Sequence, residues 1–407
     1  MRLLGAGLLV VCTLCSLARA QEREAVTQQQ ALSRANECAP DILVSLAQAA
    51  VARKDVDVAG MLSNPRISAG SSVEYTFIGT FYMWLPIFGQ RRTAEQAAIA
   101  QSKVADAAVE VMRLDARLAA AHAWIDLWAT VQETALAEDE AARYDRVLAA
   151  AQASVKDGSA PELEQIRAEA DASRAHAQVS ALAATQVAAS ARLSVLLGEG
   201  SDTRLLTASG EPNAGEPPSD AALDRDLRSH PLASHARAAV DSADAAVKRE
   251  SRARWPQLGL SVQEWLFRQP QVWAFLGGRN EIRGIATIDL PIFDKPRVAR
   301  AEALSQEARA RATAEDARLR AAAIAARADY QAAQRRCEAL ADHVAPAARI
   351  AADRAEQAYA EGELDLAAAQ MALQARSDAE RTLLTCKADR ARAWAQLEHA
   401  VGGPRDE

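Results

Sequence analysis

The sequence predicts an α+β membrane protein that is mostly α, with long antiparallel helical hairpins and two β-hairpins per protomer. Three observations predict this fold class. The motif Leu-Pro-Ile-Phe at Leu85–Phe88 returns letter for letter at Leu290–Phe293, so one structural unit is used twice. Residues that alternate between apolar and polar, as in strands, precede each copy. A helical pattern of about 65 residues follows each copy, far longer than the average helix of a globular domain.

The composition favours long helices over a deep globular core. The chain has 407 residues, of which 50% are hydrophobic by type and only 4% are aromatic. Much of the apolar share is alanine, a strong helix former with a small side chain. The formal net charge is −7, and no basic patch interleaves with aromatic residues, so nucleic-acid binding has little support.

Residues 1–20 have the features of a secretory signal peptide. Arg2 supplies the basic end, Leu3–Leu17 the apolar run, and Ala18-Arg19-Ala20 a cleavage site of small residues. An N-terminal membrane anchor is the alternative, although the run is short. No other segment has 18 consecutive apolar residues, so no further transmembrane helix is predicted. We expect residues 21–407 to be exported to an oxidising compartment.

The first repeat, about 28–198, contains a predicted β-hairpin over 65–88. Apolar residues such as Ile67 and Phe81 fall on one face of its strands, and polar residues such as Ser68 fall on the other. Two strands of about 9–10 residues fit here, the length that crosses a membrane in a tilted barrel.

Helices are predicted on both sides of this hairpin. Residues 28–60 are helical in pattern, with Pro40 near the start. From Gln90 the apolar spacing is that of a coiled coil, with Leu114, Leu118, Ala121, Ile125 and Trp128 stepping by four and three. This predicts a helix of about 66 residues, roughly 100 Å long, up to a turn at Gly158. A second helix is predicted over 161–197, and Trp124 and Trp128 are expected in the core.

A polar, proline-rich connector (199–218) leads to the second repeat, about 219–402. Its β-hairpin is predicted over 256–293, with an insertion, Arg268–Asn280, that lengthens the loop between its strands. Helices are predicted before the hairpin, over 219–253, and after it, over 297–359 and 363–401. The second repeat therefore has the same order of elements as the first.

Four strands cannot close a barrel, and open strand edges cannot face lipid, so self-association is required. Helices 161–197 and 219–253, laid end to end, match one long helix in length, as do 363–401 and 28–60. Each protomer thus offers four helical columns and four strands. Three copies would supply twelve strands, enough for a closed transmembrane β-barrel above a helical tube.

The order and duplication of these motifs resemble the TolC-like outer-membrane efflux proteins. The resemblance covers nearly the whole mature chain. It depends on the paired Leu-Pro-Ile-Phe motifs followed by basic residues and on Asn64-Pro65 and Trp255-Pro256 ahead of the strands. It also depends on the turns at Asp157-Gly158 and Glu361-Gly362-Glu363-Leu364-Asp365 and on the ending Leu397–Gly402. The length and the second turn look most like the branch that serves heavy-metal pumps of the resistance–nodulation–division class.

The resemblance implies a homotrimeric tunnel in the Gram-negative outer membrane, with a β-barrel in lipid and a helical barrel in the periplasm. It implies passive export of small solutes, metal cations among them, as the exit duct of a tripartite efflux system. The implied partners are an inner-membrane pump and a periplasmic membrane-fusion (adaptor) protein. A periplasmic coiled-coil scaffold without a barrel, or a duct for type I protein secretion, are the alternatives.

The helical tips carry the most specific functional prediction. In this family the matching turns dock the adaptor, which implies a role for Gly158, Leu163, Ile166, Gly362, Leu364 and Leu366. An ordinary hairpin turn, where glycine only supplies a positive φ, is the alternative. An acidic ring often follows the second turn in this family, but Ala368 and Met371 occupy that stretch here. Glu361, Glu363 and Asp365 could form a periplasmic gate instead, or simply be solvated.

Cys337 and Cys386 lie at nearly equal distances before and after the second turn, and therefore at one height on the predicted hairpin. A disulfide forms if they face each other, and two separate buried thiols are the alternative. Cys38 is then unpaired and expected to pack in the helical layer.

No other residues form a recognisable site. The six histidines are not spaced as metal ligands, and no phosphate loop or nucleophile elbow appears. We therefore expect no enzyme activity, no cofactor and no metal centre. Aromatic residues flank the strands and could form an interfacial belt or pack within a soluble sheet: Tyr75, Tyr82, Trp84, Trp255, Trp265 and Phe267.

Overall fold

The structure is a computed structural model that describes residues 24–71, 75–199, 205–267, 281–291 and 294–403. The expected signal peptide, the insertion Arg268–Asn280 and the last two residues of the second Leu-Pro-Ile-Phe motif lie outside the described residues. The chain divides into two compact units, and each takes segments from both repeats. Unit 1 comprises Met1–Ile42, Arg113–Leu223 and Ala322–Glu407, and unit 2 comprises Leu43–Met112 and Asp224–Ala321.

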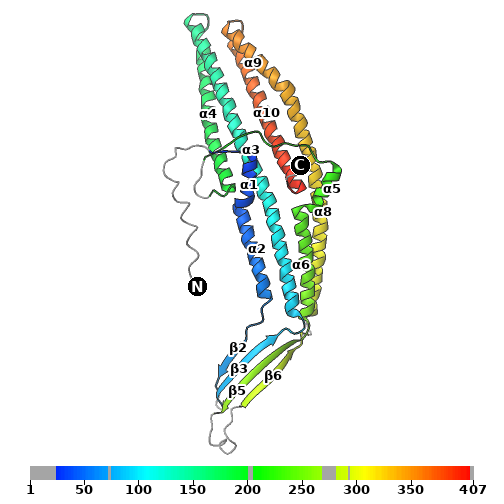
Figure 1. The fold of residues 1–407 in the computed structure, drawn as a ribbon. Coiled ribbons are helices and arrows are strands. Elements are labelled where there is room, and N and C mark those ends of the chain that lie inside the picture. The colour runs from blue at the N-terminus through cyan, green and yellow to red at the C-terminus, as the bar shows by residue number, and fades with distance from the viewer. Residues whose placement is uncertain (1–23, 72–74, 200–204, 268–280, 292–293, 404–407) are drawn as a thin grey trace, which may run out of the picture. The chain divides into compact units, whose positions relative to one another are not determined.

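Unit 2 contains a four-stranded antiparallel sheet in the order β2-β3-β5-β6 (Figure 1). The strands are β2 (Arg66–Gly70), β3 (Tyr75–Leu85), β5 (Gln257–Phe267) and β6 (Glu281–Asp289). Two hairpins, one from each repeat, are thus joined through β3 and β5. The strands themselves were predicted, although β2 is shorter than expected.

The register places the alternating residues in rows across all four strands. One row joins Ile67, Phe81, Val262 and Gly284, and the adjacent row joins Ser68, Thr80, Gln263 and Arg283. Because side chains alternate between faces, the apolar rows share one face and the polar rows share the other. The alternation predicted from sequence is therefore present in the sheet, with Glu264 as a polar residue on the apolar face. Both edge strands, β2 and β6, have one side without a partner strand in the described chain.

Two of the predicted helical segments are each divided into two helices at a proline. The segment 28–60 forms α1 (Gln28–Cys38) and α2 (Pro40–Ala59), and the segment 219–253 forms α5 (Asp220–Ser229) and α6 (Pro231–Ala253). The residue before each proline is extended, with ψ of 135° at Ala39 and 134° at His230. Proline disfavours the helical conformation in the residue that precedes it and has no N–H to donate. The same break at the same place supports the duplication.

The remaining helices are α3 (Gln90–Lys156), α4 (Glu162–Leu196), α8 (Lys295–Ala339), α9 (Ala345–Ala360) and α10 (Leu366–Val401). α3 has 67 residues, so the first long helix is confirmed. The second long helix was expected to be unbroken over 297–359, and this was wrong. A π-helix, η2 (Leu340–Val344), separates α8 from α9.

The core of unit 1 lies where α1, α3, α4 and α10 meet two short strands. β1 (Glu24–Val26) and β4 (Leu206–Ala208) pair in parallel, a feature that the sequence analysis missed. The Trp124 indole donates a hydrogen bond to the Val26 carbonyl at 2.8 Å. Trp124 and Trp128 are buried in this core, as predicted.

α4 is the one helix of the described chain that is apolar and long enough to cross a membrane by composition alone. Its buried residues lie on one side, and those of its C-terminal half join the core of unit 1. We therefore regard α4 as an alanine-rich packing helix.

Candidate functional site

The two predicted tips of unit 1 are the same helix-ending structure. Gly158 and Gly362 adopt positive φ values of 74° and 78°. Their N–H groups donate to Val155 and Tyr359, and the next N–H groups donate to Ser154 and Ala358. These are the two hydrogen bonds of a Schellman motif, which satisfies the last carbonyls of a helix. The two turns therefore have the same backbone hydrogen bonds.

The helices that follow the two turns begin differently. α4 follows Pro161, which provides no side-chain cap. α10 begins after Asp365, whose carboxylate accepts a hydrogen bond from the Ala368 N–H at 2.7 Å. A capping aspartate satisfies one of the free N–H groups at a helix start. Asp365 thus has a structural task, whereas Glu361 and Glu363 are exposed.

The residues expected to dock a partner divide into an exposed and a buried group. Leu163 and Ile166 on α4 are 54% and 55% exposed, and Met371 on α10 is 67% exposed. Leu366 is only 4% exposed and belongs to the core beneath the tips, with Leu364 packed against it. In this conformation Leu366 cannot present itself to a partner. Met371, expected only as a replacement for an acidic residue, is a better surface candidate.

The core beneath the tips joins both hairpins of unit 1. It contains residues of α3 and α4 together with residues of α9 and α10: Val147, Ala151, Ala168, Ala352, Tyr359, Leu366, Ala369 and Leu373. Four of these eight side chains are alanine, so the helices approach closely and bury little area per residue. Small side chains give a tip core with a modest hydrophobic contribution.

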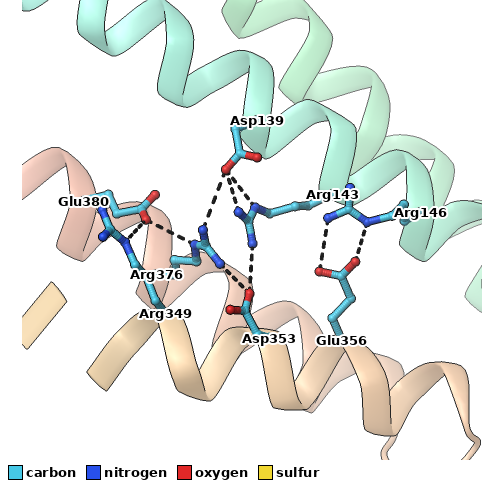
Figure 2. Close-up of polar contacts among 8 residues, drawn as sticks. All are labelled: Asp139, Arg143, Arg146, Arg349, Asp353, Glu356, Arg376 and Glu380. Atoms are coloured by element: carbon cyan, nitrogen blue, oxygen red, sulfur yellow. Dashed lines mark hydrogen bonds and ion pairs between the residues drawn. The ribbon is translucent and has the colours of Figure 1, made fainter. Parts of the chain in front are cut away.

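A network of charged side chains joins α3, α9 and α10 in the same unit (Figure 2). Arg143 of α3 contacts Asp139 at 2.6 Å and Asp353 of α9 at 3.3 Å. Arg376 of α10 contacts the same Asp353 at 2.5 Å and Glu380 at 3.2 Å. Asp353 therefore holds one arginine from each hairpin, and Figure 2 shows both guanidinium groups turned toward it.

Two further ion pairs extend this network, which we call the tip network. Arg349 of α9 contacts Glu380 of α10 at 2.7 Å, and Arg146 of α3 contacts Glu356 of α9 through two nitrogens. The hydrogen bond to Glu356 raises the pKa of Arg146 above its ordinary value. The network as a whole comprises Asp139, Arg143, Arg146, Arg349, Asp353, Glu356, Arg376 and Glu380.

Part of the tip network is buried and therefore matters more for stability than ion pairs on the surface do. The side chains of Arg143, Arg376 and Glu380 are 12%, 11% and 9% exposed. Exposed pairs contribute about 0–1 kcal/mol, but removing one member of a buried pair leaves the other charge without compensation, at a cost of several kcal/mol. The network therefore stabilises one particular arrangement of the two hairpins.

Cys337 of α8 and Cys386 of α10 form a disulfide with a Cα–Cα distance of 5.6 Å, one of the two arrangements considered from sequence. Both are buried, at 3% and 1% exposure. Cys38 is a free cysteine and is exposed, so its expected packing in the helical layer was wrong. The backbone of Cys38 instead lies close to Gly198, where an added Cβ would meet the Cys38 carbonyl oxygen at 2.4 Å.

Three of the aromatic residues expected in an interfacial belt do not lie on the apolar face of the sheet. Tyr82, Trp84 and Trp265 fall on the face shared with the polar rows, not with Ile67 and Phe81. Tyr82 and Trp84 stack edge to face over Gly259, where a Cβ would approach the Tyr82 hydroxyl to 2.5 Å. The side chains of Tyr75 and Phe267 lie outside what the structure describes. Trp255, next to Phe88, is half exposed.

Within the described ranges no group of three or more His, Cys, Asp or Glu side chains is placed to hold a metal ion. His176 pairs with Asp145, and His399 pairs with Asp115. A groove of about 850 Å³ in unit 2 lies between α3, α6 and α8, but its lining mixes alanines with charges of both signs. We find no arrangement suited to catalysis among these residues.

Comparison with solved structures identifies proteins that share this fold. No protein-family model matches the sequence, and none of the curated proteins does. The outer-membrane channel OprN superposes with a TM-score of 0.74 at 20% identity, over 93% of this chain and 90% of its own. CusC, described in terms of transmembrane channel formation, gives a TM-score of 0.76 at 17% identity, over 96% of both chains.

A third neighbour is the MtrE outer-membrane channel of Neisseria gonorrhoeae in its open state. It has a TM-score of 0.71 at 18% identity, over 92% of this chain and 89% of its own. The chain therefore has the fold of outer-membrane channels over nearly its whole length. The resemblance to TolC-like proteins is confirmed at the level of fold.

Proposed function

We propose that this chain is the exit duct of a tripartite efflux system, a homotrimeric channel in the Gram-negative outer membrane through which small solutes leave passively. The observation that carries this proposal is the sheet. In the described chain the sheet has one apolar face, an opposite face that is mostly polar, and two edges without a partner strand. The chain shares its fold with outer-membrane channels.

The apolar face of the sheet supports placement in lipid. Ile67 is 77% exposed, Ile282 69% and Ile288 62%, and all three lie on the same face of the sheet, although Ile282 pairs across strands with Glu264. Leaving such residues in water forgoes about 25 cal/mol for each Å² of apolar surface. The free backbone groups of β2 and β6 must also find partners inside a bilayer. Pairing of β2 with β6 of the next protomer meets both requirements and closes a ring.

The tips support contact with a periplasmic adaptor protein. Leu163, Ile166 and Met371 are large apolar side chains in water at the end of unit 1 that carries both turns. An adaptor that buries them would gain about 1.5–3 kcal/mol per side chain. Gly158 and Gly362 set the backbone of the turns that present them. An inner-membrane pump would then deliver solute through this junction.

The tip network supports a duct that opens and closes at this end. Opening would rotate the α9–α10 hairpin against α3, and this motion separates Asp353 from Arg143 of α3. Glu361 and Glu363 would lie at the entrance and favour cations, with metal ions as one substrate class. Tips held together by engineered cysteines should neither conduct nor export, and normal export by such channels would contradict this gating.

Membrane fractionation tests the proposal. A duct is recovered in the outer membrane as a detergent-extracted trimer and conducts in planar lipid bilayers. A monomer that is soluble without detergent would support the coiled-coil scaffold instead. Sensitivity of a deletion strain to metals, dyes and antibiotics then identifies the solute class. The reversal potential of the purified channel in a salt gradient reports whether cations are favoured.

A further inference from the structure

We propose that the π-helix η2 (Leu340–Val344) is the hinge at which the α9 tip segment moves. In this arrangement the Cys337–Cys386 disulfide fixes the helices on one side of the hinge, and the tip network holds the segment on the other side. The inference rests on the proposed gated duct and deepens it by naming where the bend occurs.

The sequence forces a break at this position. Pro346, the second residue of α9, has no N–H to donate to the carbonyl of Asp342, and its ring would clash with that carbonyl in a regular helix. The Ala345 N–H instead bonds to the Leu340 carbonyl, five residues back. π-turns within α-helices are rare and frequently mark functional positions.

The packing pattern shows that one residue is inserted here. Buried residues of α8 recur every seven positions at Ala323, Tyr330 and Cys337, and those of α9 recur every seven at Ala345, Ala352 and Tyr359. Between Cys337 and Ala345 the spacing is eight. In a regular helix the extra residue would rotate all of α9 by about 100°, since an α-helix has about 3.6 residues per turn. η2 absorbs the residue, so both helices keep their packing faces.

Little holds the hinge segment itself. None of its five residues is buried, and Val344 is 47% exposed. Exposed segments with few apolar contacts open at low free energy relative to the core. Bending at η2 therefore disturbs less packing than bending within α8 or α9 would.

On the α8 side of the hinge, α8 and α10 cannot separate. The disulfide at Cys337 lies one turn before η2. Two turns before Cys337 in α8, the Tyr330 ring packs against Trp394 of α10, with ring centroids 5.0 Å apart. The Tyr330 hydroxyl donates to the Gly215 carbonyl of the connector at 2.8 Å. This side of unit 1 is tied by one covalent bond and by the connector.

On the α9 side, the contacts are of a kind that can be broken and remade. α9 meets α3 and α10 through the alanine-rich tip core and through the ion pairs of Arg349, Asp353 and Glu356. All of these contacts lie beyond η2 in sequence. α10 has no break, so it would respond by gentle curvature, while the change of direction is concentrated in η2.

The test uses the full-length trimer in planar lipid bilayers. Arg376→Gln weakens the tip network and provides a background in which the channel opens. The straightened variant combines deletion of Ala341 with Pro346→Ala, which puts the two heptad patterns in phase and permits a continuous α-helix. In the Arg376→Gln background it should reduce conductance about tenfold, a shift of about 1.4 kcal/mol in the opening equilibrium. Pro346→Ala alone removes one of the two causes of the break but keeps the extra residue, so η2 should persist and conductance should exceed that of the straightened variant.

Conductance of the straightened variant equal to that of its background overturns the hinge and leaves the duct intact. Absence of conductance in all variants counts against the duct itself. In that case, or if the straightened variant does not assemble, hydrogen exchange of the wild-type trimer decides. Amides of Leu340–Val344 should exchange at least about tenfold faster than those of 330–337 and 352–359, an opening free energy lower by about 1.4 kcal/mol. Uniform protection from 330 to 359 overturns the hinge.

Discussion

Single charged residues decide how firmly the tips of unit 1 are held. Asp353 is shared by Arg143 and Arg376, which come from different hairpins. The sequence marks these residues only as ordinary charges on helices, because Arg143 and Asp353 lie 210 positions apart and cannot be paired by local spacing. Sequence reasoning therefore missed the tip network completely, although it placed the two turns correctly.

Arg376→Gln should lower the threshold for opening. It removes the contact of Arg376 with Asp139 of α3 at 3.8 Å and leaves the nearly buried Glu380 with Arg349 alone. Loss of a charged hydrogen-bond partner costs about 1.5–3 kcal/mol. We expect the purified trimer of this variant to conduct more than wild type at equal protein concentration. Arg318→Gln, which removes an exposed pair with Glu315 within α8, is the control and should conduct like wild type. Equal conductance of the two variants would show that the network does not hold the tips.

Glu398→Gln should stabilise the protein at neutral pH. Burial raises the pKa of Glu398 above its ordinary value of 4.5, against the opposing effects of Arg117 and a hydrogen bond from Trp394. Since the folded state favours the neutral form, this group's contribution to stability is present at low pH. This stabilising contribution is lost as the pH rises from 4.5, the ordinary pKa, through the raised pKa of the folded state. Glutamine keeps an acceptor for Trp394 without the charge.

Thermal unfolding of the trimer at pH 7 and at pH 4 measures this effect. The midpoint of Glu398→Gln should exceed that of wild type at pH 7, and the difference should shrink at pH 4. The exposed Glu361 provides the matched control, Glu361→Gln, with no comparable difference. If the difference between the unfolding midpoints of Glu398→Gln and wild type is the same at both pH values, Glu398 does not have the raised pKa.

At the scale of elements, prolines and glycines determine where helices end. Pro40 and Pro231 divide two helices at equivalent points, and Pro346 interrupts the second long helix at η2. The apolar spacing continues across all three prolines, so spacing alone predicts longer helices there than the structure has. The glycine turns were predicted correctly, since a Schellman motif needs a positive φ that glycine adopts at low cost.

Glycine can be required by a positive φ or by lack of space for a Cβ, and the variants Gly158→Ala and Gly198→Ala separate these two reasons. Both positions have φ near 75°, which costs an alanine about 1–2 kcal/mol. Space around Gly158 is open, but at Gly198 the new Cβ would meet the Cys38 carbonyl. Urea unfolding should show a loss of about 1–2 kcal/mol for Gly158→Ala and a clearly larger loss for Gly198→Ala. Equal losses would mean that the backbone at Cys38 moves aside.

At the scale of the whole molecule, the proposed association of three copies would cover surfaces that a single copy leaves exposed. The sheet ends in two unpaired strands within the described chain, and its apolar face is exposed. A helical scaffold in water would leave these features without explanation. A ring of three copies in a bilayer accounts for both, and the same fold occurs in channels of the outer membrane.

Ile67→Lys and Ser68→Lys test which medium surrounds the sheet. These neighbours on β2 lie on opposite faces and are both exposed in the protomer. A lysine on the lipid face of a barrel costs about 2–4 kcal/mol near the bilayer midplane, whereas one on the lumen face is tolerated. Ile67→Lys should reduce the amount of trimer in the outer membrane, and Ser68→Lys should not. Equal recovery of both variants would argue against a lipid-facing apolar row.

The sequence by itself determined the duplication, the strands with their two faces, the first long helix and the glycine turns. These features depend on local spacing and on the backbone preferences of glycine, which a single chain segment carries. Only the tertiary structure decided that Leu366 is buried and that Tyr82 and Trp84 share the polar face. It likewise decided which distant charges meet at Asp353 and that α9 keeps its packing face through a π-helix. Each of these depends on contacts between segments far apart in the chain, whose geometry is set by packing and not by local pattern.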